Sequence, residues 1–185
     1  MSGETRARLV ENARATQRLE PRLFRLEDDG FVPNHPRWPL LVYPAAVSLS
    51  EAPDPAAVFE DVFQRNGWGG TWRNGIYSYT HYHSQIHEAL GVARGSAKVQ
   101  FGGERGPIVE VTAGDAAVLP AGTGHKRIEA SADFLVVGAY PPEGRYDLCT
   151  RPEDRERALT TIAKTPRPVT DPVLGGEGPL IGAWT

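Results

Sequence analysis

Apolar and polar residues alternate with a period near two through the middle of the chain, which is the pattern of half-buried β-strands. Between residues 75 and 140, short runs rich in Val, Ile, Tyr and Phe are separated by glycine-bearing turns such as "ARGS", "GGERG", "TAGD" and "PAGTG". The pattern predicts about seven antiparallel strands, arranged as a sandwich or a barrel.

A short helix is predicted before this region, over residues 55–66. Asp54 is suited to cap its first turn, Pro55 suits its first helical position, and Gly67 is suited to end it. The apolar residues in between recur at helical spacing, so one face of the helix is apolar.

The N-terminal region has a different composition. Residues 4–19 are rich in Ala, Leu, Arg and Glu and contain no Gly or Pro, which predicts a helix. Residues 28–39 are interrupted by Asp-Gly and by three prolines, which is typical of a connector. The run "LLVYPAAVSL" that follows predicts a β segment, in which Pro44 indicates an edge strand or a bulge.

The C-terminal region begins with "RPEDRERALTTIAKT", which predicts a second helix entered through Thr150 and ended before Pro166. The last 20 residues have no period, but Leu180, Ile181 and Trp184 are poor choices for a solvated tail. We expect an arm that lies on the barrel or on a partner subunit.

The simplest organisation is therefore a single barrel domain over residues 39–148. An N-terminal helix and connector occupy residues 1–38, and a C-terminal helix and extended arm occupy residues 149–185. No internal repeat suggests a second barrel.

Composition excludes several function classes for this chain of 185 residues. A net charge of -3 and a pI near 6.0 offer no basic surface for nucleic acid. No apolar run approaches the roughly 20 residues that span a membrane, and the first 25 residues lack the apolar core of a signal peptide. Because the single Cys149 cannot form an intrachain disulfide, a cytoplasmic protein is expected.

The stretch "HYHSQIHE", residues 81–88, holds three of the five histidines of the chain. Alternate residues of a strand share a face, so His81 and His83 are expected to point the same way, together with Tyr77 and Tyr79. The step from His83 to Glu88 is odd, and a turn or bulge at "SQI" is needed to reset the face.

The strand after this stretch decides between two neighbouring ligand candidates. Glu88 shares a face with Leu90 and Val92, whereas His87 shares the other face with Ala89 and Gly91. The larger apolar side chains should face the barrel interior, so Glu88 is the expected inward residue. His87 is left as a neighbour of the ligands, a surface group, or the less favoured fourth ligand.

A fourth histidine, His125, begins a later strand and can approach from another edge. Three neutral imidazoles and one carboxylate suit one divalent first-row transition metal ion, such as Fe, Mn, Ni, Cu or Zn. Four protein ligands of this kind leave one or two coordination positions for water or substrate.

The spacing of these residues resembles the two motifs of the cupin family. The first motif is matched by Gly75, His81, His83, Glu88 and Gly95. The second is matched by Gly114, Pro120, Gly122 and His125, although its usual closing Asn is Glu129 here. A looser likeness through "DFLVVGAYPPEGRYDL" extends to single-domain bacterial YjlB-like cupins.

This resemblance implies an all-β fold, a single double-stranded β-helix (jelly-roll) barrel with flanking short helices and terminal extensions. It also implies a homodimer and a mononuclear metal held by His81, His83, Glu88 and His125.

Other residues have more than one possible role. Tyr77 and Tyr79 either line a substrate pocket or belong to the barrel core. Arg127, which would share a face with His125, either holds a carboxylate substrate or lies exposed at the rim. Acid–base candidates are weak and comprise Tyr79, His87 and Glu129.

The sequence is compatible with two main functions. One is a metalloenzyme of the dioxygenase or isomerase/lyase type that acts on a small organic molecule. The other is a non-catalytic module that binds or senses such a molecule. A purely structural cupin is a weaker third possibility, and barrel folds alone do not separate these alternatives.

Overall fold

The computed structural model describes residues 19–185. The predicted helix over residues 4–19 therefore lies outside the described residues, apart from its last position. The strands are β1 (Arg22–Phe24), β2 (Leu40–Tyr43), β3 (Gly69–Asn74), β4 (Glu88–Arg94), β5 (Ser96–Phe101), β6 (Ile108–Thr112), β7 (Ala116–Leu119), β8 (His125–Ala130) and β9 (Leu135–Tyr140). The helices are α2 (Pro55–Arg65), α3 (Asp154–Ile162) and α4 (Pro179–Ala183). No helix in this part of the chain is long and apolar enough to cross a membrane.

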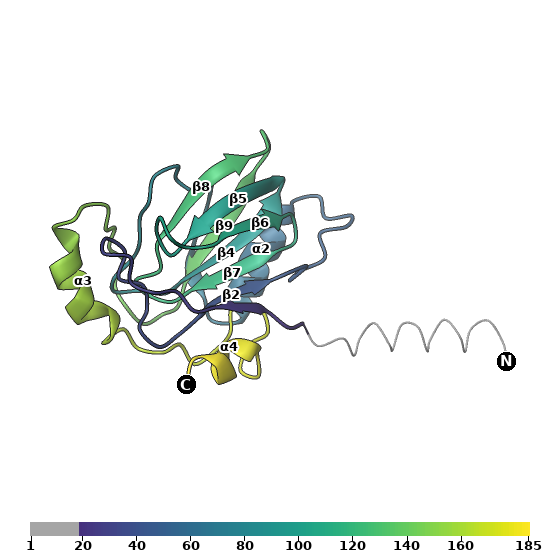
Figure 1. Cartoon of the computed structure of the whole chain (residues 1–185). Helices are drawn as coiled ribbons and strands as arrows, with labels where there is room; N and C mark the ends of the chain where they lie inside the picture. The colour runs from purple at the N-terminus through teal and green to yellow at the C-terminus, as the bar shows by residue number, and fades with distance from the viewer. Residues whose placement is uncertain (1–18) are drawn as a thin grey trace, which may run out of the picture.

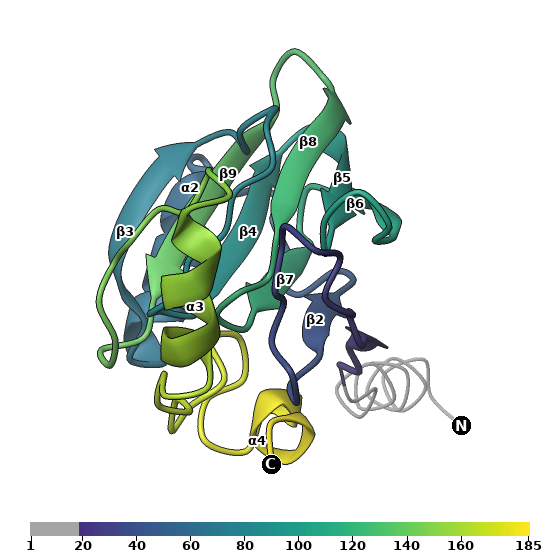
Figure 2. The ribbon, with the colours of Figure 1, turned by 60° about the vertical axis from the view of Figure 1, so that its left-hand side comes forward.

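The strands form two antiparallel sheets that face one another (Figure 1). The larger sheet has the order β1-β2-β7-β4-β9-β3, and the smaller has the order β6-β5-β8. Figure 2 shows β3, β9 and β4 on one side of the barrel and β8, β5 and β6 on the other. This arrangement confirms the predicted all-β jelly roll.

The strand count from 75 to 140 differs from the prediction. Six strands, β4 to β9, occupy this region, because residues 75–87 form no strand. They make only isolated bridges, from His81 to His125 and from Tyr82 to Cys149. Successive residues thus pair with different segments, and a continuous ladder cannot form.

The apolar core between the sheets follows from the alternation in β4. Leu90 and Val92 are buried between the sheets, whereas Ala89 and Ala93 are buried on the opposite face. The side chains on that opposite face are small because α2 packs against it. A Cβ atom on Gly91 would lie 2.5 Å from Cγ and 2.6 Å from Cε1 of the buried Phe59 ring, so only glycine lets α2 approach this closely.

Helix α2 begins as the sequence predicts. The Asp54 carboxylate accepts a hydrogen bond from the Ala56 amide at 3.1 Å, and Pro55 is the first helical residue. The chain then turns at Gly67, whose φ of 83° is readily available only to glycine. The helix therefore lies across the larger sheet and fixes β4 from outside.

Two predictions of local detail were wrong, one about the strand before Pro44 and one about the start of a helix. β2 pairs with both β1 and β7, so it is not an edge strand, and Pro44 simply follows its last residue. Helix α3 begins at Asp154 rather than near Thr150. Residues before it form a turn instead, because the Asp154 carboxylate accepts hydrogen bonds from the amides of Thr150 and Arg151, at 3.0 and 3.1 Å.

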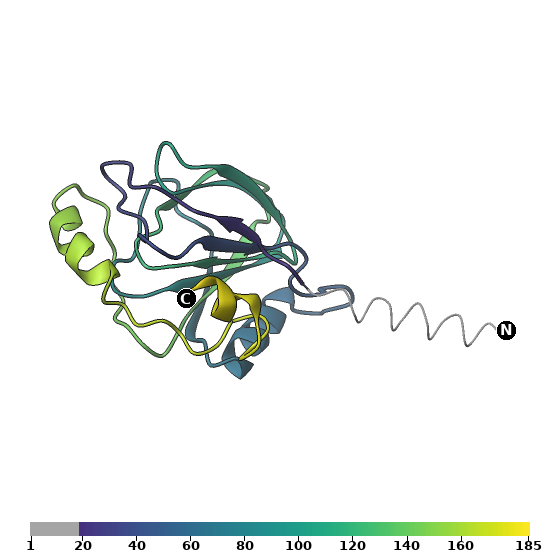
Figure 3. The same ribbon diagram turned by 60° about the horizontal axis from the view of Figure 1, so that its bottom comes forward.

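The C-terminal segment lies on its own barrel, on the same side as α2 (Figure 3). Leu180 and Trp184 are fully buried, and the Trp184 indole Nε1 donates a hydrogen bond to the Pro39 carbonyl at 2.9 Å. Of the two predicted resting places, the barrel surface is the one observed. The segment also contains the short helix α4.

Candidate metal centre

A cavity of about 360 Å³ opens beside β3 and β4 and contains the four predicted ligand residues. Its lining includes His81, His83, Glu88 and His125. These residues come from the loop before β4, from the start of β4 and from the start of β8. The structure therefore brings together residues separated by more than 40 positions in the chain.

Backbone pairing places two of the histidines side by side. The amide of each of His81 and His125 donates to the carbonyl of the other, at 3.2 and 3.0 Å. Their ring centroids lie 4.0 Å apart. The single bridge between the loop and β8 thus holds the two imidazoles on one wall of the cavity.

Glu88 is the first residue of β4 and points into the same cavity. Its Oε2 atom lies 3.4 Å from Nε2 of His83 and 3.4 Å from Nε2 of His125. The carboxylate is 3% exposed, and Oε2 has no hydrogen-bond partner. A buried carboxylate oxygen left unpaired is costly, which makes this atom a natural ligand for a cation.

The tautomers of the three cavity histidines are fixed by their backbone contacts. In each ring, Nδ1 faces a backbone carbonyl, which can only accept, so Nδ1 carries the proton of the neutral imidazole. The accepting carbonyls for His81, His83 and His125 belong to Tyr79, Asp147 and Thr123. In its neutral form each ring then keeps its Nε2 lone pair available to a metal ion, and this is how metal-ligating histidines are usually oriented.

The electrostatics of the cavity also favour a cation. Burial lowers the pKa of His81 to about 3, and the neighbouring His125 adds to this effect. Burial opposes ionisation of Glu88, but His83 and His125 outweigh it and hold the Glu88 pKa below its usual range. Burial likewise lowers the pKa of His83, but Glu88 outweighs it and raises that pKa to about 9. The Glu88 carboxylate is therefore ionised, and the protonated His83 ring is its positive partner. A divalent ion bound by both side chains would take the place of the His83 Nε2 proton.

The residues fit a divalent metal in donor type and orientation. The donor atoms are nevertheless not closed into a finished coordination shell: among residues 19–185 no three His, Cys, Asp or Glu side chains are arranged as a ready metal site. The His83 ring centroid lies 6.1 Å from that of His81 and 6.3 Å from that of His125.

His87 faces away from the cavity. It is fully buried on the opposite side of β4, where Nδ1 accepts a hydrogen bond from the Ala121 amide at 2.9 Å and Nε2 donates to the Pro166 carbonyl at 3.0 Å. Its ring packs against Trp184, with centroids 4.9 Å apart. Neither of its nitrogens is available as a ligand, and it is not a surface group.

Of the other residues that the sequence suggested for the site, one lines the cavity and three do not. Tyr77 lines the cavity and is 44% exposed. Tyr79 stacks on Tyr77 but lies outside the lining. Arg127 and Glu129 are exposed on the edge strand β8 and do not line the cavity either, so of the two positions considered for Arg127 the exposed rim is the one observed. Glu129 instead pairs with Lys98 at 2.9 Å.

Three aromatic residues that the motifs did not single out complete the cavity wall. They are Trp72, Tyr140 and Tyr146. Tyr146 packs its ring 5.1 Å from that of His83, and the Tyr140 hydroxyl accepts a hydrogen bond from the Trp72 indole at 2.9 Å. The stretch "EGRYDL" that contains Tyr146 belongs to the looser likeness, but it contains no ligand pattern.

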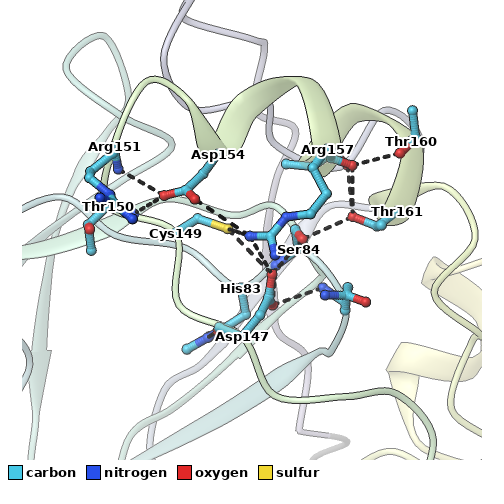
Figure 4. Close-up of polar contacts among 12 residues, drawn as sticks. His83, Ser84, Asp147, Cys149, Thr150, Arg151, Asp154, Arg157, Thr160 and Thr161 are labelled. Carbon is cyan, nitrogen blue, oxygen red and sulfur yellow. Dashed lines mark hydrogen bonds and ion pairs between the residues drawn. The ribbon is translucent and has the colours of Figure 1, made fainter.

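Asp147, also in that stretch, secures the loop that carries His83 (Figure 4). Its backbone carbonyl accepts the Nδ1 proton of His83. Its carboxylate accepts hydrogen bonds from the Ser84 amide at 2.8 Å, the Ser84 hydroxyl at 2.6 Å and the Gln85 amide at 3.2 Å. One residue thus holds both the ring of His83 and the backbone after it.

Helix α3 is joined to the same loop. The Thr161 hydroxyl donates to the Ser84 hydroxyl at 2.9 Å, and Arg157 lies 3.8 Å from the Asp147 carboxylate (Figure 4). Cys149 is buried beside Asp147, and burial raises the pKa of its thiol to about 11. A thiol with such a pKa is a poor nucleophile at neutral pH, as the sequence predicts.

Comparison with known proteins gives one extensive match. The chain is 40% identical over 166 residues to the uncharacterized protein YjlB of Bacillus subtilis (strain 168), an alignment that covers 89% of this chain and 97% of YjlB. No protein-family model matches the chain.

Solved structures give partial matches. An acireductone dioxygenase from Bacillus anthracis, with a cadmium ion in its active centre, matches with a TM-score of 0.36 and 16% identity, over 57% of this chain and 80% of that one. A sugar 3,4-ketoisomerase from Thermoanaerobacterium thermosaccharolyticum, in complex with TDP, matches with a TM-score of 0.34 and 12% identity, over 51% of this chain and 71% of that one. At such scores these likenesses establish nothing about activity.

The extensive match and the observed jelly roll agree with the motif spacing in the sequence. The chain belongs to the YjlB-like family of single-domain cupins.

Proposed function

We propose that this cupin binds one divalent first-row transition metal ion through His81, His83, Glu88 and His125. The observation that carries the proposal is the donor set in the cavity: three histidine rings and a buried carboxylate oxygen without a hydrogen-bond partner line the same space. The backbone carbonyls opposite Nδ1 keep the three rings in the orientation that binding requires.

We further propose that the ion serves chemistry on a small organic molecule, of the dioxygenase or isomerase/lyase type. When bound, such an ion supplies a Lewis-acid centre or a binding position for dioxygen. The chain supplies a cavity that holds the molecule beside the ligands. Tyr140 keeps its proton at neutral pH, because burial and the negative charge of Glu88 raise its pKa, so its hydroxyl can donate a hydrogen bond to a bound oxygen atom.

A specific observation supports the alternative of a non-catalytic binding module. Apart from the proposed ligands, the titratable side chains that line the cavity in the described residues are Arg73 and the tyrosines. No free carboxylate or imidazole is therefore at hand for general acid–base catalysis, and any proton transfer would fall to a tyrosine.

Metal analysis of protein purified without added metal tests the proposal. About one ion per chain is expected in the wild type, and a large loss is expected for His81→Ala. The matched control is His35→Asn, which removes a buried histidine outside the cavity. A wild type that holds only traces of metal after reconstitution, or unchanged metal content in His81→Ala, would contradict the proposal.

Water proton relaxation of the manganese-loaded protein then separates the two functions. An enzyme requires a coordination position with exchangeable water, which enhances relaxation. A closed coordination sphere without enhancement would favour the binding module. The predicted homodimer is tested separately, by light scattering of the eluted protein.

A further inference from the structure

We infer, on the basis of the proposed metal site, the chemical class of the molecule that the cavity accepts. The geometry points to a planar phenol or enol that binds the ion through oxygen as a monoanion. Phosphorylated compounds and dicarboxylates are expected to be excluded. Two features of the cavity wall and the charge of the proposed metal centre lead to this inference.

The first feature is an aromatic wall next to the proposed ligands. Tyr146 is 54% exposed and Tyr77 is 44% exposed, although both line the cavity. The Tyr77 ring lies 5.0 Å from that of His81, and the Tyr146 ring lies 5.1 Å from that of His83. Exposed ring faces at this position provide stacking surfaces for a flat ligand that reaches the histidines.

The second feature is that the positively charged side chain in the cavity wall is already paired with carboxylates. Arg73 is the one Arg or Lys among the described residues that line the cavity. Its Nε and Nη2 atoms donate to the two carboxylate oxygens of Glu60, each at 2.7 Å, and Nη1 donates to Asp54 at 2.9 Å. Because two carboxylates already occupy this guanidinium, it is not free to form the bidentate contact by which proteins usually recognise phosphate or carboxylate.

The third feature is the charge balance of the proposed centre. A divalent ion with the single carboxylate of Glu88 and three neutral imidazoles carries a net charge of about +1. One negative charge on the ligand neutralises this centre. A dianion would leave an excess negative charge in a buried site with no free cation to compensate it.

The aromatic wall and the charge balance favour the same class of ligand. A singly deprotonated phenol or enol offers the oxygen donor, the single charge and the flat face together. A phosphate ester or a dicarboxylate satisfies neither the wall nor the charge.

The test uses 4-nitrophenol as the probe, because it can supply only one negative oxygen, and the zinc-loaded full chain, because zinc adds no absorption of its own. Zinc content is measured before and after each titration. We expect a saturable shift of the probe's absorption, which inorganic phosphate and succinate at equal concentration do not reverse. Tyr146→Ala should weaken probe binding by about threefold to tenfold.

Ile108→Ala is the control, because this side chain is similarly exposed at 57% but lies on the edge strand β6, outside the cavity lining. Its affinity for the probe should equal that of the wild type. Equal weakening in both variants would overturn the inference, as would displacement of the probe by phosphate or succinate. A chain that keeps its zinc but does not bind the probe overturns only this inference, whereas a chain that takes up no zinc overturns the proposed metal site as well.

Discussion

Replacement of Asp147 by Asn should weaken metal binding although Asp147 is not one of the proposed ligands. The Asp147 carboxylate anchors the backbone of Ser84 and Gln85, immediately after His83. Asn retains one oxygen for these amides but loses the second acceptor and the charge. The loop is then free to move, and the His83 ring moves with it.

The magnitude follows from the contacts that are lost. The Asp147 side chain is 9% exposed, and its contact with the Ser84 hydroxyl at 2.6 Å is charge-assisted, which is typically worth about 1.5–3 kcal/mol of stability. Arg157 is 52% exposed at 3.8 Å and adds little. Disruption of a residue that orients a metal ligand typically costs about 10–100-fold in metal affinity.

The assay compares metal affinity, by competition with a chromophoric chelator, with the free energy of unfolding of the metal-free protein in urea. Asp154→Asn is the control: Asp154 also accepts two backbone amides and also approaches Arg157, at 3.6 Å, but makes no contact with the His83 loop. We expect both variants to lose stability and only Asp147→Asn to lose metal affinity. Equal losses of affinity, or an Asp147→Asn affinity within about twofold of the wild type, would refute the reasoning.

Three further predictions concern the scaffold, and urea unfolding checks each. Gly91→Ala should destabilise the protein by about 1–3 kcal/mol because its Cβ would overlap the buried Phe59 ring, whereas Gly69→Ala, with open space around the new methyl group, should not; equal effects would contradict the packing of α2. Burial, aided by Arg37, lowers the pKa of His35 to about 4, so its protonation in the unfolded chain alone should remove about 3 kcal/mol of stability as the pH falls from 6.5 to about 4; His35→Gln should flatten this dependence, and an unchanged slope would count against it. Trp184→Ala should cost about 3–5 kcal/mol because the side chain is fully buried, and a loss under about 1 kcal/mol would argue against the observed packing of the C-terminal segment.

The fold was predictable where local pattern and tertiary environment agree. In β4, the alternation of Glu88 and Leu90 with small residues assigned the inward face, and α2 could be located from its cap. The segment over residues 75–87 has a similar alternation but is not a strand. Its residues form isolated backbone pairs with different segments and not a continuous ladder with one neighbouring strand. β1 has only three residues, too few to give a periodic signal.

The cavity was predictable only in its ligand positions. Strand alternation distinguishes Glu88 from His87, since adjacent residues of β4 must face opposite sides. The wall residue Tyr146 and the anchor Asp147 lie in a loop about 60 residues beyond His83, and they contact it only after the barrel closes. No short-range spacing encodes such contacts. Arg127 shows the opposite case, a residue with the expected strand position that is nevertheless exposed, next to a register shift in the pairing of β8 with β5.

The placement of Glu88 and His125 on different sheets has a thermodynamic consequence. Glu88 starts a strand of the six-stranded sheet, and His125 starts a strand of the three-stranded sheet. An ion shared by these two side chains would cross-link the halves of the barrel, so its binding free energy would oppose their separation. Amide hydrogen exchange in β4 and β8 should therefore slow on metal loading, while exchange in α3, which belongs to neither sheet, should change less.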